Sequence, residues 1–177
     1  MITQKDVFLA EKTTMRIGGY ANSFYIPESE EELIQIAQEI YDTDHRVFIL
    51  SGGSNLLIND KKRFNAIVHM KSACTEMTHL GEGKFYIGAS NRIQKVIAYV
   101  NDFEYGGFEG LIGLPAMFGG IIYMNAGLGG SKRPLFTISD FIESVRVWDM
   151  KKKSSWKCTC QNVNFPTVNQ YSTQVIT

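Results

Sequence analysis

Hydrophobic and polar positions follow two different periods along the chain, and together they predict a mixture of strands and helices. The segment from Asn22 to Ile26 is typical of a short strand, which Pro27 ends. A helix is expected next, because Ser29 and Glu32 have the spacing of a capping box with Ser29 as the N-cap. The apolar face predicted for this helix consists of Leu33, Ile36, Ala37, Ile40 and Tyr41.

Further β-branched and aromatic runs predict strands at residues 46–50, 66–70, 84–88 and 145–149. A second amphipathic helix is expected to begin near Asn91, and its predicted buried side consists of Ile93, Val96, Ile97, Val100 and Phe103. The order of elements lacks the regular alternation of a doubly wound sheet. We therefore predict an α+β fold in two lobes, residues 1–64 and 65–153, followed by a tail of different composition at 154–177.

Composition narrows the classes of function. The chain has 177 residues, and its 18 basic residues balance 18 acidic ones. Without a basic excess, nucleic-acid binding is not expected. Neither a signal peptide nor a bilayer-spanning apolar run is evident, so we expect no membrane association. Three cysteines cannot all pair, which favours a reducing cytoplasm.

The first notable motif directly follows the strand predicted at residues 46–50. It reads Ser51-Gly52-Gly53-Ser54-Asn55-Leu56. Paired glycines allow successive backbone N–H groups to point into one concavity, which suits a phosphate or pyrophosphate. The motif contains no Walker lysine and is not G-x-G-x-x-G. A simple tight turn explains the local sequence equally well.

A second glycine-rich stretch holds nine of the 16 glycines within residues 106–130. Fixing glycine costs backbone entropy, so such a concentration suggests a backbone that closely approaches something flat and bulky, such as a planar cofactor ring. Close helix packing over Gly119 and Gly120 is the alternative. That alternative explains single glycines but not the whole stretch.

Together with Thr13-Thr14-Met15-Arg16-Ile17-Gly18-Gly19, these stretches resemble one family in order and spacing over about residues 9–153. It is the family of UDP-N-acetylenolpyruvoylglucosamine reductase, also called UDP-N-acetylmuramate dehydrogenase. Its motifs T-T-x-x-I-G-G, G-G-S-N-L-L and E-x-x-x-G-I-P-G-x-x-G-G-x-x-x-M-N-A-G have close counterparts here, the last from Glu109 to Gly127.

The resemblance implies a two-lobed FAD-binding domain of the vanillyl-alcohol-oxidase/PCMH type. In the family, NADPH reduces FAD, and the flavin then reduces the enolpyruvyl group of a UDP-sugar in peptidoglycan synthesis. The residues that would bind FAD by this resemblance are Ser51, Gly52, Gly53, Ser54, Asn55, Leu56, Gly113, Leu114, Pro115, Ala116, Gly119, Gly120 and Asn125. The glycine-serine loop would hold the pyrophosphate, and the later residues would line the ribityl chain and the ring.

Several positions depart from the family pattern. Leu114 and Ala116 replace the Ile and the second Gly of G-I-P-G, and Leu128-Gly129-Gly130 replaces A-Y-G. The family's later motif E-C-x-F-x-Y-R-x-S, which carries a catalytic Arg, has no counterpart, nor do the catalytic Ser and Glu of the substrate-binding domain. We therefore assign no catalytic residue and expect FAD binding with little or no turnover.

The tail suggests a reason for these losses. Residues 158–177 contain no charged side chain, although one-fifth of the chain is charged. Back-translation of residues 161–171, read from the third base of each codon, permits E-C-K-F-S-Y-R-K-S-I, which is the missing motif at its expected place. We hypothesise a frameshift between about Asp149 and Gln161. A native, divergent tail is the alternative.

Other reactive side chains give no second site. His45, His69 and His79 share no ligand spacing, and Cys158 and Cys160 form C-x-C, so no metal is expected. Two other interpretations compete with that of a reductase domain. One is a stand-alone flavin or nucleotide carrier with a native tail, and the other is a non-functional fragment with an exposed edge.

Overall fold

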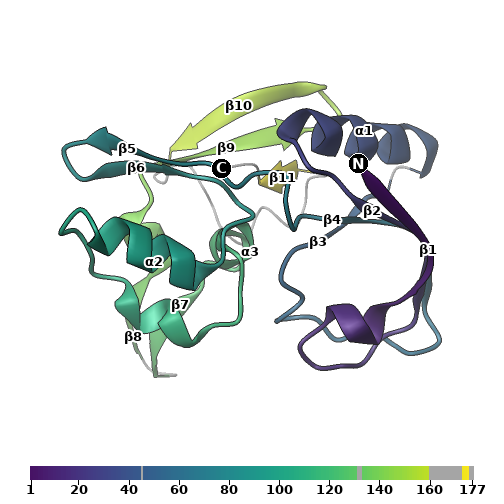
Figure 1. The fold of residues 1–177 in the computed structure, drawn as a ribbon, viewed down its shortest axis with the longest axis horizontal. Helices are drawn as coiled ribbons and strands as arrows, with labels where there is room; N and C mark the ends of the chain where they lie inside the picture. The colour runs from purple at the N-terminus through teal and green to yellow at the C-terminus, as the bar shows by residue number, and fades with distance from the viewer. Residues whose placement is uncertain (45, 131–132, 160–172, 176–177) are drawn as a thin grey trace. The chain divides into compact units, whose positions relative to one another are not determined.

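The computed structural model describes residues 1–44, 46–130, 133–159 and 173–175. The chain divides into two compact units, Met1–Cys74 and Thr75–Thr177. Both units mix helices and strands, as predicted for an α+β protein (Figure 1). The division follows the fourth strand, whereas the predicted limit after residue 64 falls inside it.

The first unit is built on a four-stranded sheet with the order β1-β2-β4-β3. Its strands are β1 Ile2–Phe8, β2 Tyr20–Ile26, β3 Phe48–Leu50 and β4 Arg63–His69. β1 runs antiparallel to β2, while β4 runs parallel to both β2 and β3. Since β4 is hydrogen-bonded on both edges, it belongs to this unit.

Helix α1, Glu30–Asp44, connects β2 to β3 and contacts β4. The Ser29 hydroxyl accepts the Glu32 N–H at 3.2 Å, which confirms the predicted N-cap. The capping box is incomplete, because the Glu32 carboxylate accepts the Glu28 N–H instead. The core of the unit contains Leu9, from the 3-10 helix η1 (Leu9–Lys12), with Ala21, Phe24, Leu50, Ile58 and Ile67.

The second unit contains two hairpins and a three-stranded sheet around two helices. The hairpins are β5 Met77–Gly81 with β6 Lys84–Ile87, and β7 Gly127–Gly130 with β8 Arg133–Thr137. The sheet places β9 Ser144–Asp149 between β10 Ser154–Thr159 and β11 Thr173–Val175. The helices are α2 Ile93–Asn101 and α3 Phe118–Tyr123, with short 3-10 helices η2 Glu109–Gly113 and η3 Ile138–Phe141.

The core of the second unit packs one face of α2 against α3 and β9. Four of the five residues predicted on the buried side of α2 are buried. Phe103 is the exception, with an exposed fraction of 40%. The helix ends at Asn101, so the helical period no longer places Phe103 on the buried face. Its ring instead contacts His79, with centroids 4.4 Å apart.

The tail lies mostly outside the described residues. Its first part forms β10, which pairs with β9 in an unbroken antiparallel register. Residues 160–172 and 176–177 are not described, so the structure leaves the frameshift hypothesis a prediction.

Candidate functional site

The glycine-serine loop begins where β3 leaves the sheet of the first unit. The carbonyl of Leu50 accepts the Met70 N–H at 2.8 Å, and residues 51–56 then form a loop. Gly53 is buried and has φ +64°, a left-handed conformation that favours glycine. A Cβ at Gly53 would overlap the carbonyl oxygen of Lys12. Both the conformation and the space therefore require glycine at this position.

The amides of this loop are available to a ligand. Within the described residues, the backbone N–H groups of Gly52, Gly53, Ser54 and Asn55 donate no hydrogen bond to the protein. Unpaired N–H groups that are even partly buried are unusual, and successive ones form an anion-binding nest. This donor set fits the oxygens of a pyrophosphate.

The Thr13–Gly19 segment packs directly against this loop. The Thr14 N–H donates to the Gly53 carbonyl at 3.0 Å, and the Thr13 hydroxyl donates to the Ile17 carbonyl at 3.1 Å. The Gly18 N–H donates to the Asp60 carboxylate at 3.0 Å. A Cβ at Gly19 would overlap the Lys62 carbonyl. The sequence of the Thr13–Gly19 segment alone predicted only a turn. In the structure, the segment supports the glycine-serine loop.

His69 is a neighbour of the loop that the sequence did not single out. It ends β4, and its ring lies 5.3 Å from the ring of Phe24, centroid to centroid. Burial lowers its pKa to about 4, with smaller contributions from the charges of Lys71 and Lys12, while a hydrogen bond to the backbone of Ser51 opposes the shift. His69 is thus a neutral group beside the loop at neutral pH. The sequence signal that could have identified His69 was its position near the end of the strand predicted at residues 66–70.

The later predicted residues gather around α3 in the second unit. Gly113 ends η2, and Leu114, Pro115 and Ala116 connect it to α3. Gln94 fixes this connection, because its side-chain amide donates to the carbonyls of Ile112 at 2.7 Å and Leu114 at 2.8 Å. A Cβ at Gly113 would meet nothing within 4 Å, and the neighbouring Ile112 side chain is 55% exposed. Open space beside the Gly113 backbone, next to an exposed apolar side chain, fits the approach of a planar ring.

Gly119 has a packing role that the sequence analysis gave as the alternative. A Cβ there would lie 2.8 Å from the Cβ of Ala89. The Gly119 N–H donates to the Ala89 carbonyl at 2.9 Å, and the Phe118 N–H donates to the Asn91 carbonyl at 2.8 Å. The buried segment Ala89-Ser90-Asn91, which the sequence analysis missed, therefore holds the start of α3.

Asn125 lies just beyond α3 with φ +45°, and its side-chain carbonyl accepts the Ser139 N–H at 3.2 Å. Asparagine tolerates this left-handed conformation better than most residues do. Asn125 therefore fixes the connection to η3.

In the described part of the chain, no group of three or more His, Cys, Asp or Glu side chains is placed to hold a metal ion. The thiols of Cys74 and Cys158 are buried. Cys160 and His45 lie outside the described residues. No described helix is both long and apolar enough to span a bilayer.

Comparison with known proteins agrees with this geometry. Residues 21–153 match the family of FAD binding domains. The match covers most of the chain, and the chain belongs to this family. Its cofactor is accordingly FAD.

The similar sequences define the relationship more narrowly. UDP-N-acetylenolpyruvoylglucosamine reductase of Fusobacterium nucleatum is 31% identical over 137 residues, which are 77% of this chain and 46% of the relative. The reductase of the same name from Chlamydia felis is 32% identical over 80% of this chain and 46% of its own length. The chain thus resembles slightly less than half of each reductase.

Solved structures show the fold. The flavoenzyme CrmK superposes with a TM-score of 0.64 over 99% of this chain and 39% of its own, at 20% identity. Physcomitrella patens BBE-like 1 gives a TM-score of 0.67 at 14% identity, over 99% of this chain and 41% of its own. The fold is that of vanillyl-alcohol-oxidase/PCMH flavoenzymes, as the resemblance implied.

Proposed function

We propose that this chain is the FAD-binding part of a reductase that converts UDP-N-acetylglucosamine enolpyruvate to UDP-N-acetylmuramate with NADPH. The observation that carries the proposal is the run of N–H groups at Gly52–Asn55 that donate no hydrogen bond within the described residues, in the loop that resembles the G-G-S-N-L-L motif of the reductase family. The cytoplasm is the expected compartment, since nucleotide sugar and NADPH are found there.

Each predicted set of residues has a distinct task in this proposal. The loop of Gly52, Gly53, Ser54 and Asn55 would bind the pyrophosphate through backbone N–H groups, which match an anion without a lysine. Thr14 and His69 would hold that loop in shape through its backbone. Preorganised amides lose little entropy on binding, so the loop favours affinity for the dinucleotide.

The second set would position the ring. Gly113 leaves open space, and Gly119 brings α3 close to Ala89, so that the backbone of 113–120 can present a flat surface. When bound, FAD supplies hydride transfer between NADPH and the enolpyruvyl group. The chain contains no counterpart of the E-C-x-F-x-Y-R-x-S motif, whose Arg helps to stabilise the reaction intermediate in the family, nor of the family's protonating Ser. This proposal therefore assigns the chain cofactor binding without turnover.

The test measures flavin binding by the purified 177-residue chain. We expect quenching of flavin fluorescence that saturates with FAD, and at least tenfold weaker binding of riboflavin, which has no pyrophosphate. Equal affinity for FAD and riboflavin would contradict the role of the loop. Oxidation of NADPH that depends on the enolpyruvyl substrate would instead show that the chain is active as it stands.

A further inference from the structure

Two lysines from separate segments of the first unit lie beside the glycine-serine loop, which has no lysine of its own. Lys12 ends η1, and its backbone carbonyl lies against Gly53, where a Cβ would overlap it. Lys71 follows β4, and its N–H donates to the His69 carbonyl at 2.8 Å. Leu50 and His69 are partners in the parallel register of β3 and β4. The loop and Lys71 therefore leave the sheet at the same edge.

The side chain of Lys12 is connected to the loop through two rings. Its ammonium group lies over the ring of Phe24, 5.9 Å from the centroid. The ring of Phe24 lies 5.3 Å from the ring of His69, which is hydrogen-bonded to the backbone of Ser51. Lys12 is half-buried, so water screens its charge less than it would on an open surface.

The charges of both lysines act at His69. Burial is the largest cause of the lowered pKa of His69, and the charges of Lys71 and Lys12 lower it further. The charged groups that the described chain places near this imidazole are thus both cations. Neither lysine forms an ion pair within the described ranges. The electrostatic potential beside the loop is therefore positive before a ligand binds.

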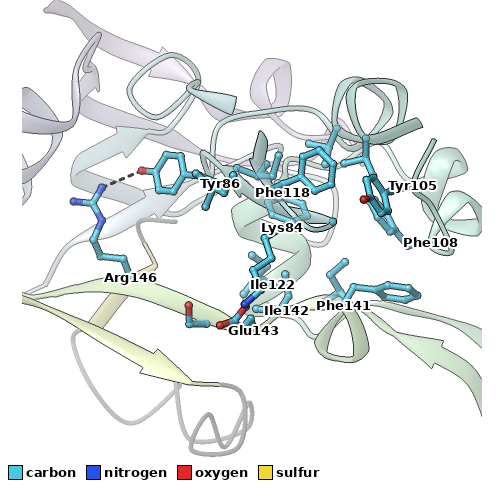
Figure 2. Close-up of a pocket in the computed structure, with 18 of the residues that line it drawn as sticks. Lys84, Tyr86, Tyr105, Phe108, Phe118, Ile122, Phe141, Ile142, Glu143 and Arg146 are labelled. Carbon is cyan, nitrogen blue, oxygen red and sulfur yellow. Dashed lines mark hydrogen bonds and ion pairs between the residues drawn. The ribbon is translucent and has the colours of Figure 1, made fainter. Parts of the chain in front are cut away.

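Basic side chains at the cavity of the second unit are arranged differently. Figure 2 shows this cavity, which has a volume of about 580 Å³. Lys84 forms an ion pair with Glu143 at 3.1 Å, and Arg146 donates to the Tyr86 hydroxyl at 3.0 Å. Lys84 and Arg146 are thus held by other groups of the protein, whereas the two lysines beside the loop have no anionic partner among the described residues.

We propose that Lys12 and Lys71 supply the positive charge for the pyrophosphate of FAD, in addition to the N–H groups of Gly52–Asn55. The inference rests on the proposed function, because it concerns the same loop. Backbone N–H groups carry only partial charges, whereas each phosphate of FAD carries a full negative charge. Two ammonium groups would balance the two phosphates by Coulomb attraction. The lysines would thereby favour FAD over riboflavin, which has no phosphate.

The first test needs no flavin. Lys12→Gln and Lys71→Gln should each raise the pKa of His69 from its value of about 4, because each removes a cation that lowers it. Nuclear magnetic resonance of the imidazole protons measures this titration. Added FAD should raise the same pKa in the unchanged chain, since the pyrophosphate counters the two positive charges. If neither variant changes the titration of His69, the lysine charges do not reach the loop, and the proposal is overturned.

Lys5→Gln is the matched control. The Lys5 ammonium donates to the Ser23 hydroxyl at 2.8 Å. Successive side chains of a strand point to opposite faces, so Ser23 and Lys5 lie on the other face of the sheet from Phe24. The control removes the same charge from the same unit, and we expect it to change neither the titration of His69 nor the affinity for FAD.

The second test measures affinity by flavin fluorescence at about 50 mM and about 500 mM salt, which screen charges over different distances. At the lower concentration, each lysine variant should bind FAD about threefold more weakly than the unchanged chain, and riboflavin equally well. The difference for FAD should shrink at the higher concentration. Glutamine keeps a long polar side chain at each position, and thermal unfolding verifies that each variant retains the fold.

The outcomes separate this proposal from the proposed function. If the unchanged chain prefers FAD to riboflavin and both lysine variants bind FAD as tightly as it does, the role of the lysines is overturned and the proposed function stands. If the unchanged chain itself does not bind FAD, the proposed function is contradicted and the role of the lysines is overturned with it.

Discussion

The backbone N–H of Thr14 donates a hydrogen bond of 3.0 Å to the carbonyl of Gly53. This bond joins two motifs that lie far apart in the sequence. The Gly53 carbonyl thus already accepts a hydrogen bond within the protein, whereas the Gly53 N–H donates none within the described residues. Through this bond, the Thr13–Gly19 segment helps to hold the backbone of the loop in place.

Gly53→Ala should abolish this arrangement. Alanine at φ +64° is strained, and its Cβ would overlap the Lys12 carbonyl, so we expect a stability loss of about 2–4 kcal/mol together with loss of FAD binding. Gly81→Ala is the matched control, since Gly81 has φ +91° but open space around it. Chemical denaturation should show a loss of only about 1 kcal/mol for the control. Equal losses in the two variants would contradict the packing argument.

Gly113→Ala should affect the cofactor and not the fold. The added methyl group meets nothing within 4 Å in the protein, so the melting temperature without FAD should stay the same or rise slightly. If the flavin approaches this backbone, its affinity should fall about tenfold, which corresponds to ~1.4 kcal/mol. Fluorescence titration measures this change. Unchanged FAD affinity would remove Gly113 from the binding site.

His69 should make stability dependent on pH. Its pKa in the folded protein is about 4, below the ordinary value of 6.5, so the unfolded chain binds a proton more readily. The stabilisation is therefore complete above pH 6.5 and is lost as the pH falls from 6.5 towards 4. We expect this loss to be on the order of 1 kcal/mol, because the side chain is only partly buried.

Denaturation of His69→Gln at pH 7 and pH 4.5 tests this expectation. The variant should lose less stability between the two pH values than the unchanged chain does. His79→Gln is the control, since His79 lies in the other unit among aromatic rings. If His69→Gln loses as much stability between the two pH values as the unchanged chain, other groups cause the pH dependence.

The nucleotide sequence tests the hypothesis about the tail. Read from codon 149 onward in the shifted frame, the gene should encode E-C-x-F-x-Y-R-x-S and remain open for a further domain. If the gene does so, we expect that a chain translated in that frame oxidises NADPH in the presence of the enolpyruvyl sugar. A shifted frame that closes at once would establish the tail as native and favour the flavin-carrier interpretation.

Much of the fold could be predicted because its elements have local causes. Ser29 caps α1 as expected, and the periodic apolar residues of α2 are buried up to Val100. The hairpin of β7 and β8 was not predicted, since its glycine-rich first strand has little strand propensity and exists through pairing. Phe103 was misplaced because the helical period was extended beyond the end of the helix.

The sequence by itself determined the family, the cofactor and the positions of the glycine motifs, because each motif constrains a few neighbouring residues. Only the tertiary structure decided what each glycine does. Gly53 is required by the Lys12 carbonyl and Gly119 by Ala89, while Gly113 borders open space. These differences depend on contacts between segments distant in sequence.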